Sequence, residues 1–442
     1  MKDGKISRRD FVGGGAAAIA GFTIVPRHVL GGAGNTAASE KLNIAAIGVG
    51  GRGAGDIDSV SSENIVALCD VDQRSAAGTF QKYPNARQYK DFRKMLDKED
   101  KNIDAVIVAT PDHVHAAATM AAIKRGKHVY CEKPLAHCIY EVRKVTEAAR
   151  EAGVATQLGN QGQASESTRL AAEYIRGGAI GKVREVHSWC NRWISQRGQN
   201  RPADTPAVPD GLDWDLWLGP RKERPYHPLY LPFTWRGWWD FGTGVLGDIG
   251  CHQFAPIWRA LEPGYPVSVD ACTSGVNDET APLTSIIRYD FPDRGEMPAF
   301  KLTWYDGGLM PARPEELEEG RRFGDADDNL YIGDKGKMLS HRLLPESRNA
   351  EYGKPARIYE RSPGHHEEWV MACKGGPKAG SNFDVSGPMA EVVLLGNIAI
   401  KMGQKLYEKG MKLYYDGPGM KITNLDEANK HIRDEYREGW EL

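Results

Sequence analysis

Short apolar runs recur along the first part of the chain, separated by segments of helical character. The runs that we expect to be strands are residues 41–47, 65–69, 105–109, 128–131 and 154–158. Continuous apolar strands are typical of a parallel sheet that is covered on both faces. Helices are expected between them, at 115–125 and 140–151. Strands that alternate with helices predict an α/β doubly wound domain, which we place at residues 41–160.

The pattern changes in the second half, where strand-like segments follow one another without long helices between them. The expected strands are residues 183–191, 268–273, 285–291, 299–305, 329–332 and 356–360. This arrangement favours an antiparallel sheet. Helices are expected at 245–260 and 392–402. We therefore expect a second, α+β domain over residues 161–403 and a C-terminal extension over residues 404–442.

Composition and charge exclude several classes of protein. With 41 % hydrophobic and 26 % charged residues, the chain is neither a disordered protein nor a coiled coil. A net charge of −2 leaves no basic surface typical of nucleic-acid binding. The longest apolar run lies near the N-terminus and is too short and glycine-rich to span a bilayer. We expect no nucleic-acid partner and no stable membrane anchor.

The N-terminus has the layout of an export signal. Ser7-Arg8-Arg9-Asp10-Phe11-Val12 precedes a weakly apolar stretch and resembles the twin-arginine motif, although an ordinary basic amphipathic start is the alternative. The first cysteine is Cys69, which excludes a lipid anchor at the end of the signal. We expect residues 1–40 to be signal and linker and the protein to reach the periplasm.

The cysteine and histidine patterns give no support for a metal site. The seven cysteines are scattered and include no C-x-x-C pair, so neither a zinc site nor an even disulfide set is expected. His365-His366-Glu367 resembles a ligand cluster, but adjacent histidines point in different directions on any regular element. We therefore expect no bound metal.

A glycine-rich turn follows the first strand. Gly48, Gly50 and Gly53 fit the pattern G-x-G-x-x-G, and Asp70 ends the second strand 22 residues after Gly48. In this context the turn predicts a dinucleotide site: the glycines allow a tight turn, close approach of a pyrophosphate and close helix packing, and the acid binds the adenosine ribose. A plain turn with a helix-capping Asp is the alternative.

The residues after Asp70 bear on the choice of nucleotide. Asp72 adds a second negative charge that disfavours a 2′-phosphate, so NAD is expected rather than NADP. Arg74 is the opposing feature, because it could pair with that phosphate.

An acid and a histidine share one face of an expected helix in the second domain. Asp248 and His252 are four residues apart, so they lie on one side of the helix 245–260. A carboxylate beside an imidazole can orient it and raise its basicity. A surface ion pair or a satisfied core histidine is the alternative.

Tryptophans are concentrated in the middle of the chain, with eight of the eleven between Trp189 and Trp258. Trp193, Trp235, Trp238 and Trp239 fall in expected loops, and Arg236 lies among them. Indole faces can stack on sugar rings. Packing between the domains is the alternative for each ring. We expect Trp193, Trp235 and Arg236 to contact substrate.

Taken together, these segments resemble the Gfo/Idh/MocA family of NAD(P)-dependent oxidoreductases. The resemblance rests on the turn 48–53, on 109–111 with His115, on the segment 131–135 and on the segment 247–252, and it spans about residues 42–403. It implies a Rossmann domain followed by a domain with a large open, mainly antiparallel sheet. The nucleotide contacts that we expect are Gly48, Gly50, Gly51, Arg52, Gly53, Asp70, Thr110, Pro111, His115, Glu132, Lys133, Asn160 and Gln161.

The resemblance also implies the chemistry. Lys133, Asp248 and His252 are expected to line a sugar or polyol site and to carry catalysis, with His252 as base and Lys133 as stabiliser of the same oxygen. Because the periplasm offers no obvious supply of NAD, we expect the nucleotide to be retained. Two alternatives stay open: an NAD-dependent glycosidase that works by transient oxidation and elimination, and a non-catalytic module that binds NAD and a sugar. A homo-oligomer formed through the second-domain sheet is also expected.

Overall fold

We describe a computed structural model of the chain, which covers residues 40–192, 196–275 and 277–442. The expected export signal and Trp193 lie outside these described residues.

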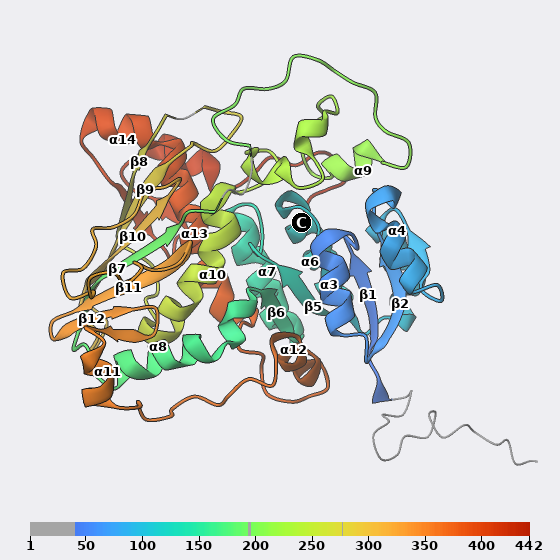
Figure 1. The fold of residues 1–442 in the computed structure, drawn as a ribbon. Coiled ribbons are helices and arrows are strands. Elements are labelled where there is room, and N and C mark those ends of the chain that lie inside the picture. Colours follow the sequence, from blue (N-terminus) through green and yellow to red (C-terminus); the bar gives the residue numbers. More distant parts are fainter. Residues whose placement is uncertain (1–39, 193–195, 276) are drawn as a thin grey trace, which may run out of the picture.

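The first domain is built on six parallel strands in the order β3-β2-β1-β4-β5-β6 (Figure 1). The strands are β1 (Asn43–Ile47), β2 (Asn64–Cys69), β3 (Arg87–Tyr89), β4 (Ala105–Val108), β5 (His128–Glu132) and β6 (Thr156–Gly159). The helices between them are α3 (Gly51–Ser59), α4 (Gln73–Lys82), α5 (Phe92–Glu99), α6 (Asp112–Ile123) and α7 (Ile139–Ala152). Strand order reverses between β1 and β4, which opens a crevice at their carboxyl ends.

Both faces of this sheet are buried, as the apolar runs predict. Side chains of a strand alternate between faces, so Ala45 and Ile47 join the core under α5, α6 and α7. Ile44 and Ala46 face the opposite way, into a second core with α3 and α4. Helix α12 (His365–Cys373) comes from much later in the chain and adds Trp369 to that second core.

The second domain is an open nine-stranded sheet in the order β13-β12-β11-β7-β10-β9-β8-β14-β15. All neighbouring pairs are antiparallel except β7 and β10. The strands are β7 (Val183–Cys190), β8 (Ser268–Thr273), β9 (Ser285–Phe291), β10 (Phe300–Asp306), β11 (Asp327–Gly333), β12 (Gly336–Leu339), β13 (Arg342–Leu344), β14 (Leu413–Asp416) and β15 (Lys421–Ile422). The Rossmann and open-sheet fold class expected from the sequence is confirmed.

Helices cover the face of this sheet that looks toward the first domain (Figure 1). Besides α12, the described helices after the first domain are α8 (Glu166–Arg176), α9 (Trp214–Leu218), α10 (Gly244–Leu261), α11 (Ser347–Tyr352), α13 (Phe383–Lys401) and α14 (Gly403–Lys409). Among the described helices, α13 has the length and apolar composition of a membrane span, but 83 % of its most apolar window is buried inside the protein. It is a core helix that packs against α7 and α10.

One expected strand is wrong. Residues 356–360 form no strand, and Ile358 is half exposed. The backbone N–H groups of Ile358 and Tyr359 donate instead to the carboxylate of Glu173 on α8, so a side chain satisfies donors that a neighbouring strand would otherwise pair with. The end of the chain also differs from a simple extension, because β14 and β15 join the sheet and the residues after 426 return to the first domain.

The described cysteines form no disulfide, and the adjacent His365 and His366 contact different groups of the protein. All seven cysteines are free thiols, and five of them are buried. The ring of His365 bonds the carbonyl oxygen of Leu158, whereas the ring of His366 bonds the carboxylate of Asp56. The two neighbouring rings therefore face different partners.

Candidate active site

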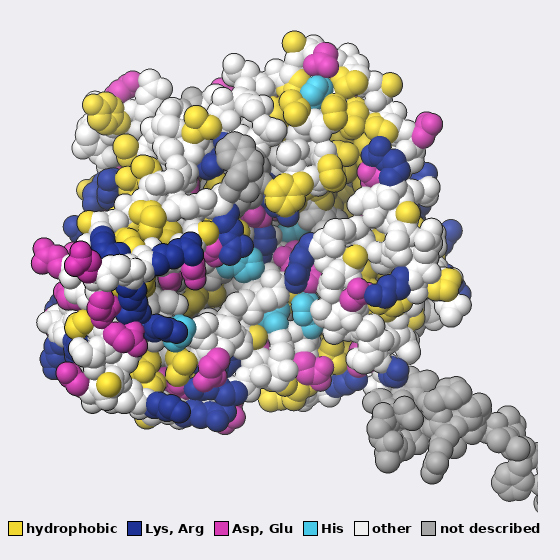
Figure 2. Space-filling view, viewed as in Figure 1, with side chains coloured by type: hydrophobic (Ala, Val, Ile, Leu, Met, Phe, Trp, Pro, Cys, Tyr) yellow, Lys and Arg dark blue, Asp and Glu magenta, His cyan; other side chains and the backbone are white. Residues whose placement is uncertain are grey.

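A cavity of about 590 Å³ lies between the two domains, beyond the carboxyl ends of β1, β2, β4 and β5. Figure 2 shows it as a hollow in which charged and histidine side chains gather, bordered above by hydrophobic side chains. This is the edge at which doubly wound sheets bind ligands. The expected site residues that line it are Gly48, Gly50, Gly51, Arg52, Asp70, Thr110, Pro111, Glu132, Lys133, Gln161, Trp235, Arg236 and His252.

The glycine-rich turn forms one wall of the cavity, and the reason why glycine occupies each position differs from one position to the next. Gly48 has φ +78°, and a Cβ there would lie 2.7 Å from the segment after β4. A Cβ on Gly53 would collide with the carbonyl of Gly48, so this glycine allows α3 to pack closely on the sheet. A Cβ on Gly50 would strike the hydroxyl of Ser75. Gly50 therefore packs closely against α4 while it also lines the cavity, and Gly51, with φ +50°, has open space where its Cβ would lie.

Asp70 sits at the end of β2 and holds the turn in place. One oxygen of its carboxylate accepts the backbone N–H groups of Val49 and Gly50, at 2.9 and 3.2 Å, and the other accepts that of Asp72. Burial raises the pKa of Asp70, although these three N–H donors oppose that shift. Arg74 does not extend freely over the turn, because its guanidinium makes a two-point ion pair with Asp72 at 2.7 and 2.8 Å.

Lys133 meets Asp248 across the domain boundary. Its Nζ lies 2.5 Å from Oδ1 of Asp248, and the same oxygen accepts Nε of Arg236 at 3.0 Å. Burial disfavours the Lys133 ammonium, but the carboxylates of Asp248 and Glu132 outweigh it and raise the pKa of Lys133. Burial also opposes ionisation of Asp248, yet the two cations lower its pKa to about 2. Lys133, Asp248 and Arg236 thus form a charged trio, in which Lys133 and Asp248 stay ionised at neutral pH.

The expected pairing of Asp248 with His252 is wrong. Both residues lie on α10, but Asp248 turns to Lys133 and Arg236, and no described residue hydrogen-bonds the His252 ring. Two cations compete more strongly for a buried carboxylate than a neutral ring does. Burial and the nearby Lys133 charge lower the pKa of His252 to about 3. The imidazole is therefore unprotonated at neutral pH, and its ring is free to hydrogen-bond a ligand.

Glu132 lies at the centre of a polar network beneath the turn. Its Oε1 accepts Nε2 of Gln161 at 2.7 Å and Nε of Arg52 at 3.1 Å. Burial, and then repulsion from Asp56, raises the pKa of Glu132 to about 7. Gln161 also donates to the hydroxyl of Tyr130. These bonds fix the wall of the cavity next to Lys133.

His115 and Asn160 were expected to contact the nucleotide, but neither lines the cavity. Both are buried and hold neighbouring loops. The ring of His115 lies 2.6 Å from the carbonyl oxygen of Pro134 and 2.7 Å from that of Thr110, joining the two loops that follow β4 and β5. The amide of Asn160 donates to the carbonyl of Cys251 on α10.

The tryptophans divide between the cavity and the core. Trp235 lines the cavity, and the guanidinium of Arg236 lies 4.2 Å from its ring and 4.2 Å from the ring of Phe233. Trp238 and Trp239 are buried and do not line the cavity, so packing explains them, whereas Trp235 borders the cavity although it is only 7 % exposed. Phe233, which was not among the expected contacts, is half exposed on the cavity wall. The position of Phe233 in a Trp-rich loop was the sequence signal that could have identified it as a cavity residue.

Further cavity residues come from distant parts of the chain and were not expected either. Phe92 follows β3, Trp217 belongs to α9, and Trp440 lies near the end of the chain. Long-range packing brings them together, and no local motif marks them.

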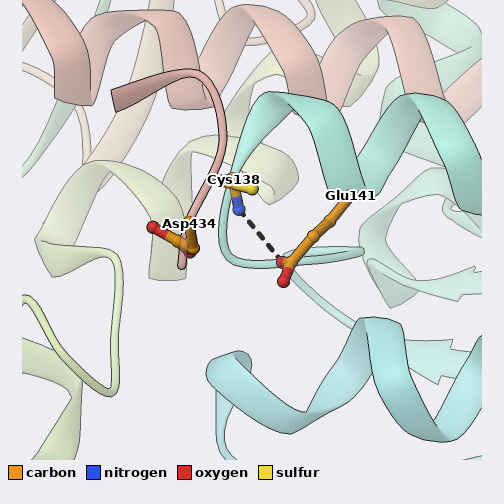
Figure 3. A group of neighbouring side chains, drawn as sticks. All are labelled: Cys138, Glu141 and Asp434. Carbon is orange, nitrogen blue, oxygen red and sulfur yellow. Dashed lines mark hydrogen bonds between the residues drawn. The ribbon is translucent and has the colours of Figure 1, made fainter. Parts of the chain in front are cut away.

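Apart from this cavity, the described residues include one group with metal-ligating atoms, formed by Cys138, Glu141 and Asp434 (Figure 3). Glu141 accepts the backbone N–H groups of His137 and Cys138 at the start of α7. Asp434 accepts Nδ1 of His137 and a guanidinium N–H of Arg221. These protein donors engage one oxygen of each carboxylate, and the bonds of Asp434 fasten the last segment of the chain beside the start of α7.

Comparison with known proteins gives matches to both domains. A family model described as the oxidoreductase family, NAD-binding Rossmann fold, matches residues 42–160, and one described as its C-terminal alpha/beta domain matches residues 180–297. Levoglucosan dehydrogenase of Pseudarthrobacter phenanthrenivorans is 30 % identical over 186 residues, which are 42 % of this chain and 39 % of that protein. Inositol 2-dehydrogenase 2 of Saccharopolyspora erythraea is 32 % identical over 174 residues, 38 % of this chain and 48 % of that protein. The matches thus span less than half the length of these curated relatives.

A solved structure shares the overall fold. The WlbA dehydrogenase of Bordetella pertussis matches with a TM-score of 0.58 at 16 % identity, over 85 % of this chain and 99 % of that chain. The parallel sheet, its glycine-rich turn and the acid after β2 define a nucleotide-binding Rossmann domain, here joined to an open-sheet domain that closes the cavity. The chain belongs to the Gfo/Idh/MocA family of NAD-binding oxidoreductases.

Proposed function

We propose that this protein is an NAD-dependent oxidoreductase that oxidises a secondary alcohol of a sugar, polyol or glycoside and retains its nucleotide between turnovers. The observation that carries the proposal is that Lys133 and His252, from different domains, line the same cavity as the Gly48–Gly51 turn and Asp70. The names of the curated relatives, levoglucosan dehydrogenase and inositol 2-dehydrogenase, support this substrate class.

The residues present fit a dinucleotide. The open space at Gly51 and the N-terminus of α3 would take the pyrophosphate, and Asp70 would take the adenosine ribose. Glu132 and Lys133 would flank the nicotinamide, which supplies the hydride acceptor when bound. NAD is favoured over NADP because Asp70 and Asp72 carry negative charge at this end and Asp72 already engages Arg74.

The protein groups divide the remaining work on one substrate oxygen. The neutral His252 ring accepts the hydroxyl proton as hydride leaves the carbon. The charged Lys133 donates a hydrogen bond to the same oxygen and stabilises the negative charge that develops there. Asp248 is a positioning residue, since it holds Lys133 and Arg236 in place. Trp235 and Phe233 offer ring faces on which a sugar can stack.

Two further proposals concern the cellular location of the enzyme and its assembly. Export through the twin-arginine route, based on Ser7–Val12, would carry the folded, nucleotide-loaded protein to the periplasm. Assembly into a homo-oligomer would use the face of the nine-stranded sheet that the helices leave uncovered (Figure 1).

A panel of sugars, polyols and aryl glycosides tests the proposed function. The purified protein is mixed with each compound, and NADH absorbance and released aglycone are followed together. We expect a polyol or sugar to reduce the bound nucleotide, with no aglycone released. Aglycone release without net reduction would replace the proposal with the glycosidase, and binding without either reaction would replace it with a non-catalytic module.

A further inference from the structure

One end of the cavity is closed by segments that have no part in the chemistry. Asp70 marks the adenosine side of the proposed nucleotide, and Lys133 marks the reacting side. Strand β3 lies beyond β2, on the side away from β5, so Phe92 at the start of α5 lies at the adenosine end. Trp440 packs edge-on against Phe92, with ring centroids 6.0 Å apart, and both rings line the cavity.

The first closing segment, residues 211–222, lies over the loop after β2. Leu212 forms an isolated antiparallel bridge with Asp72. The N–H of Gln73 donates to the carbonyl of Gly211, and the N–H of Asp213 donates to the carbonyl of Val71. Helix α9 follows at once and contributes cavity-lining residues. The segment is thus bound by backbone hydrogen bonds to the loop that carries the adenosine end of the site.

The second closing segment, residues 432–440, ends in the indole of Trp440. This side chain is only 7 % exposed, and the guanidinium of Arg93 lies 4.2 Å from its ring. Gly219, at the end of α9, lies beside the indole, because a Cβ there would be in van der Waals contact with it at 3.5 Å. Figure 1 places the end of the chain beside α9 and α6.

The two segments are fastened to each other. Arg437 donates to the carboxylate of Asp215 at 2.5 Å and to the carbonyl of Gly219 at 2.9 Å, and its own N–H bonds the carbonyl of Pro220. Nearer the core, Asp434 pairs with Arg221 and takes part in the group drawn in Figure 3. The whole unit is therefore anchored to α7, and Trp440 is held at its free edge.

We infer that residues 211–222 and 432–440 form a clasp that holds the adenine base of the bound dinucleotide and limits its release. The inference rests on the proposed function and deepens it, because it assigns nucleotide retention to particular residues. A flat, uncharged purine suits a chamber end with aromatic walls formed by Phe92, Trp217 and Trp440. Release of the base requires Trp440 to leave Phe92 and Arg93, and the bonds of Arg437 oppose that movement.

Dissociation of nucleotide from the full-length protein tests the clasp. The protein is loaded with NADH, and the loss of its fluorescence is followed after addition of excess NAD. Removing one base-stacking ring in other proteins weakens binding by about 10- to 100-fold, and we expect Trp440→Ala to accelerate release by that factor. Trp440→Phe should restore most of the retention. Arg437→Met should accelerate release without changing the cavity wall.

A matched control removes a surface ion pair outside the clasp. Lys378 and Asp384 pair at 3.0 Å with side chains 79 and 36 % exposed, and neither belongs to the two closing segments or lines the cavity. Lys378→Ala should release NADH at the wild-type rate. Thermal unfolding shows whether Trp440→Ala still folds. If it does not, the rate of NADH release from Arg437→Met decides whether the clasp limits release. ADP-ribose affinity should fall in the clasp variants as well, since this probe carries the adenine without the nicotinamide.

Two failures are distinguishable. If the wild-type protein binds no NADH at all, the proposed function fails, and the clasp with it. If wild-type protein retains NADH and forms it from bound NAD with a sugar, yet Trp440→Ala and Arg437→Met release it at the wild-type rate, the clasp is overturned and the proposed function stands.

Discussion

Substitution of Asp248 by Asn isolates the electrostatic centre of the site. The exchange keeps the size of the side chain but removes the negative charge that Lys133 and Arg236 share through one oxygen. The side chains of Lys133 and Asp248 are only 11 and 8 % exposed, so the variant leaves two cations close together with little water around them. Breaking a buried ion pair from one side costs about 3–5 kcal/mol. We expect the free energy of unfolding to fall by that amount at pH 7.

The way in which the stability of the variant changes with pH follows from the pKa of Lys133. Asp248 makes the largest of the attractions that offset burial of Lys133. Without it, we expect the pKa of folded-state Lys133 to fall below its unfolded value. The unfolded chain then binds more protons in the interval between the two pKa values, and the stability of the variant rises relative to wild type as the pH rises through it. The gap between variant and wild type should be widest near neutral pH and narrow toward pH 10.

The assay is urea unfolding followed by tryptophan fluorescence, at neutral and alkaline pH, on protein saturated with NAD. Asp58→Asn is the matched control, because Asp58 pairs with Lys82 at 2.7 Å on the surface, with side chains 45 and 58 % exposed. Exposed pairs contribute about 0–1 kcal/mol. A loss for Asp248→Asn no larger than that of the control, or a gap that does not change with pH, would refute the assignment of a buried, charged trio.

Three further predictions address the nucleotide, the base and the compartment. Asp70→Ala should weaken NAD binding, measured by calorimetry, far more than it changes the KM for the sugar. Denatured wild-type protein should release NAD, and finding only NADP would contradict the assignment of the nucleotide. Because burial and Lys133 lower the pKa of His252 to about 3, the ring stays unprotonated over the usual assay range, and kcat/KM should show no acid limb near the ordinary histidine pKa of about 6.5; a limb there that disappears in His252→Asn would oppose it. Arg8→Lys with Arg9→Lys should stop export and leave activity in the cytoplasm, as fractionation of cells would reveal, and normal periplasmic levels would disprove the twin-arginine route.

Local pattern was sufficient to predict five of the six strands of the first domain, because buried parallel strands are largely apolar. The short strand β3 (Arg87–Tyr89) is mostly exposed and was not expected. The positive φ of Gly48 and Gly51 explains why the turn after β1 favours glycine. Because parallel strands end at one edge, the segments after β4 and β5 must lie beside that turn, and this follows from the order of the elements along the chain. Lys133 and Thr110 therefore fell in the cavity as expected.

Contacts between residues far apart in the sequence could not be predicted from the sequence pattern. The helical spacing of Asp248 and His252 gave a shared face correctly, but it carried no information about Lys133, 115 residues away, which takes the carboxylate. The contact between Gly50 and Ser75 was also not predictable, because Ser75 belongs to another helix. Trp440 meets Phe92 only after the chain has built both domains, so no spacing rule could place it in the cavity.

The central claim is that Lys133 and His252 act together on one substrate oxygen. Single-turnover reduction of the bound nucleotide, with the best substrate of the panel, measures it in wild type, Lys133→Met, His252→Asn and the double variant. Each single change should slow the reaction by about 10² to 10⁴, the usual contribution of one positioned acid–base group, with NAD binding nearly intact. The double variant should lose far less than the product of the two single losses, because both groups serve the same oxygen. A fully multiplicative loss, or near-normal turnover in either single variant, would contradict the account.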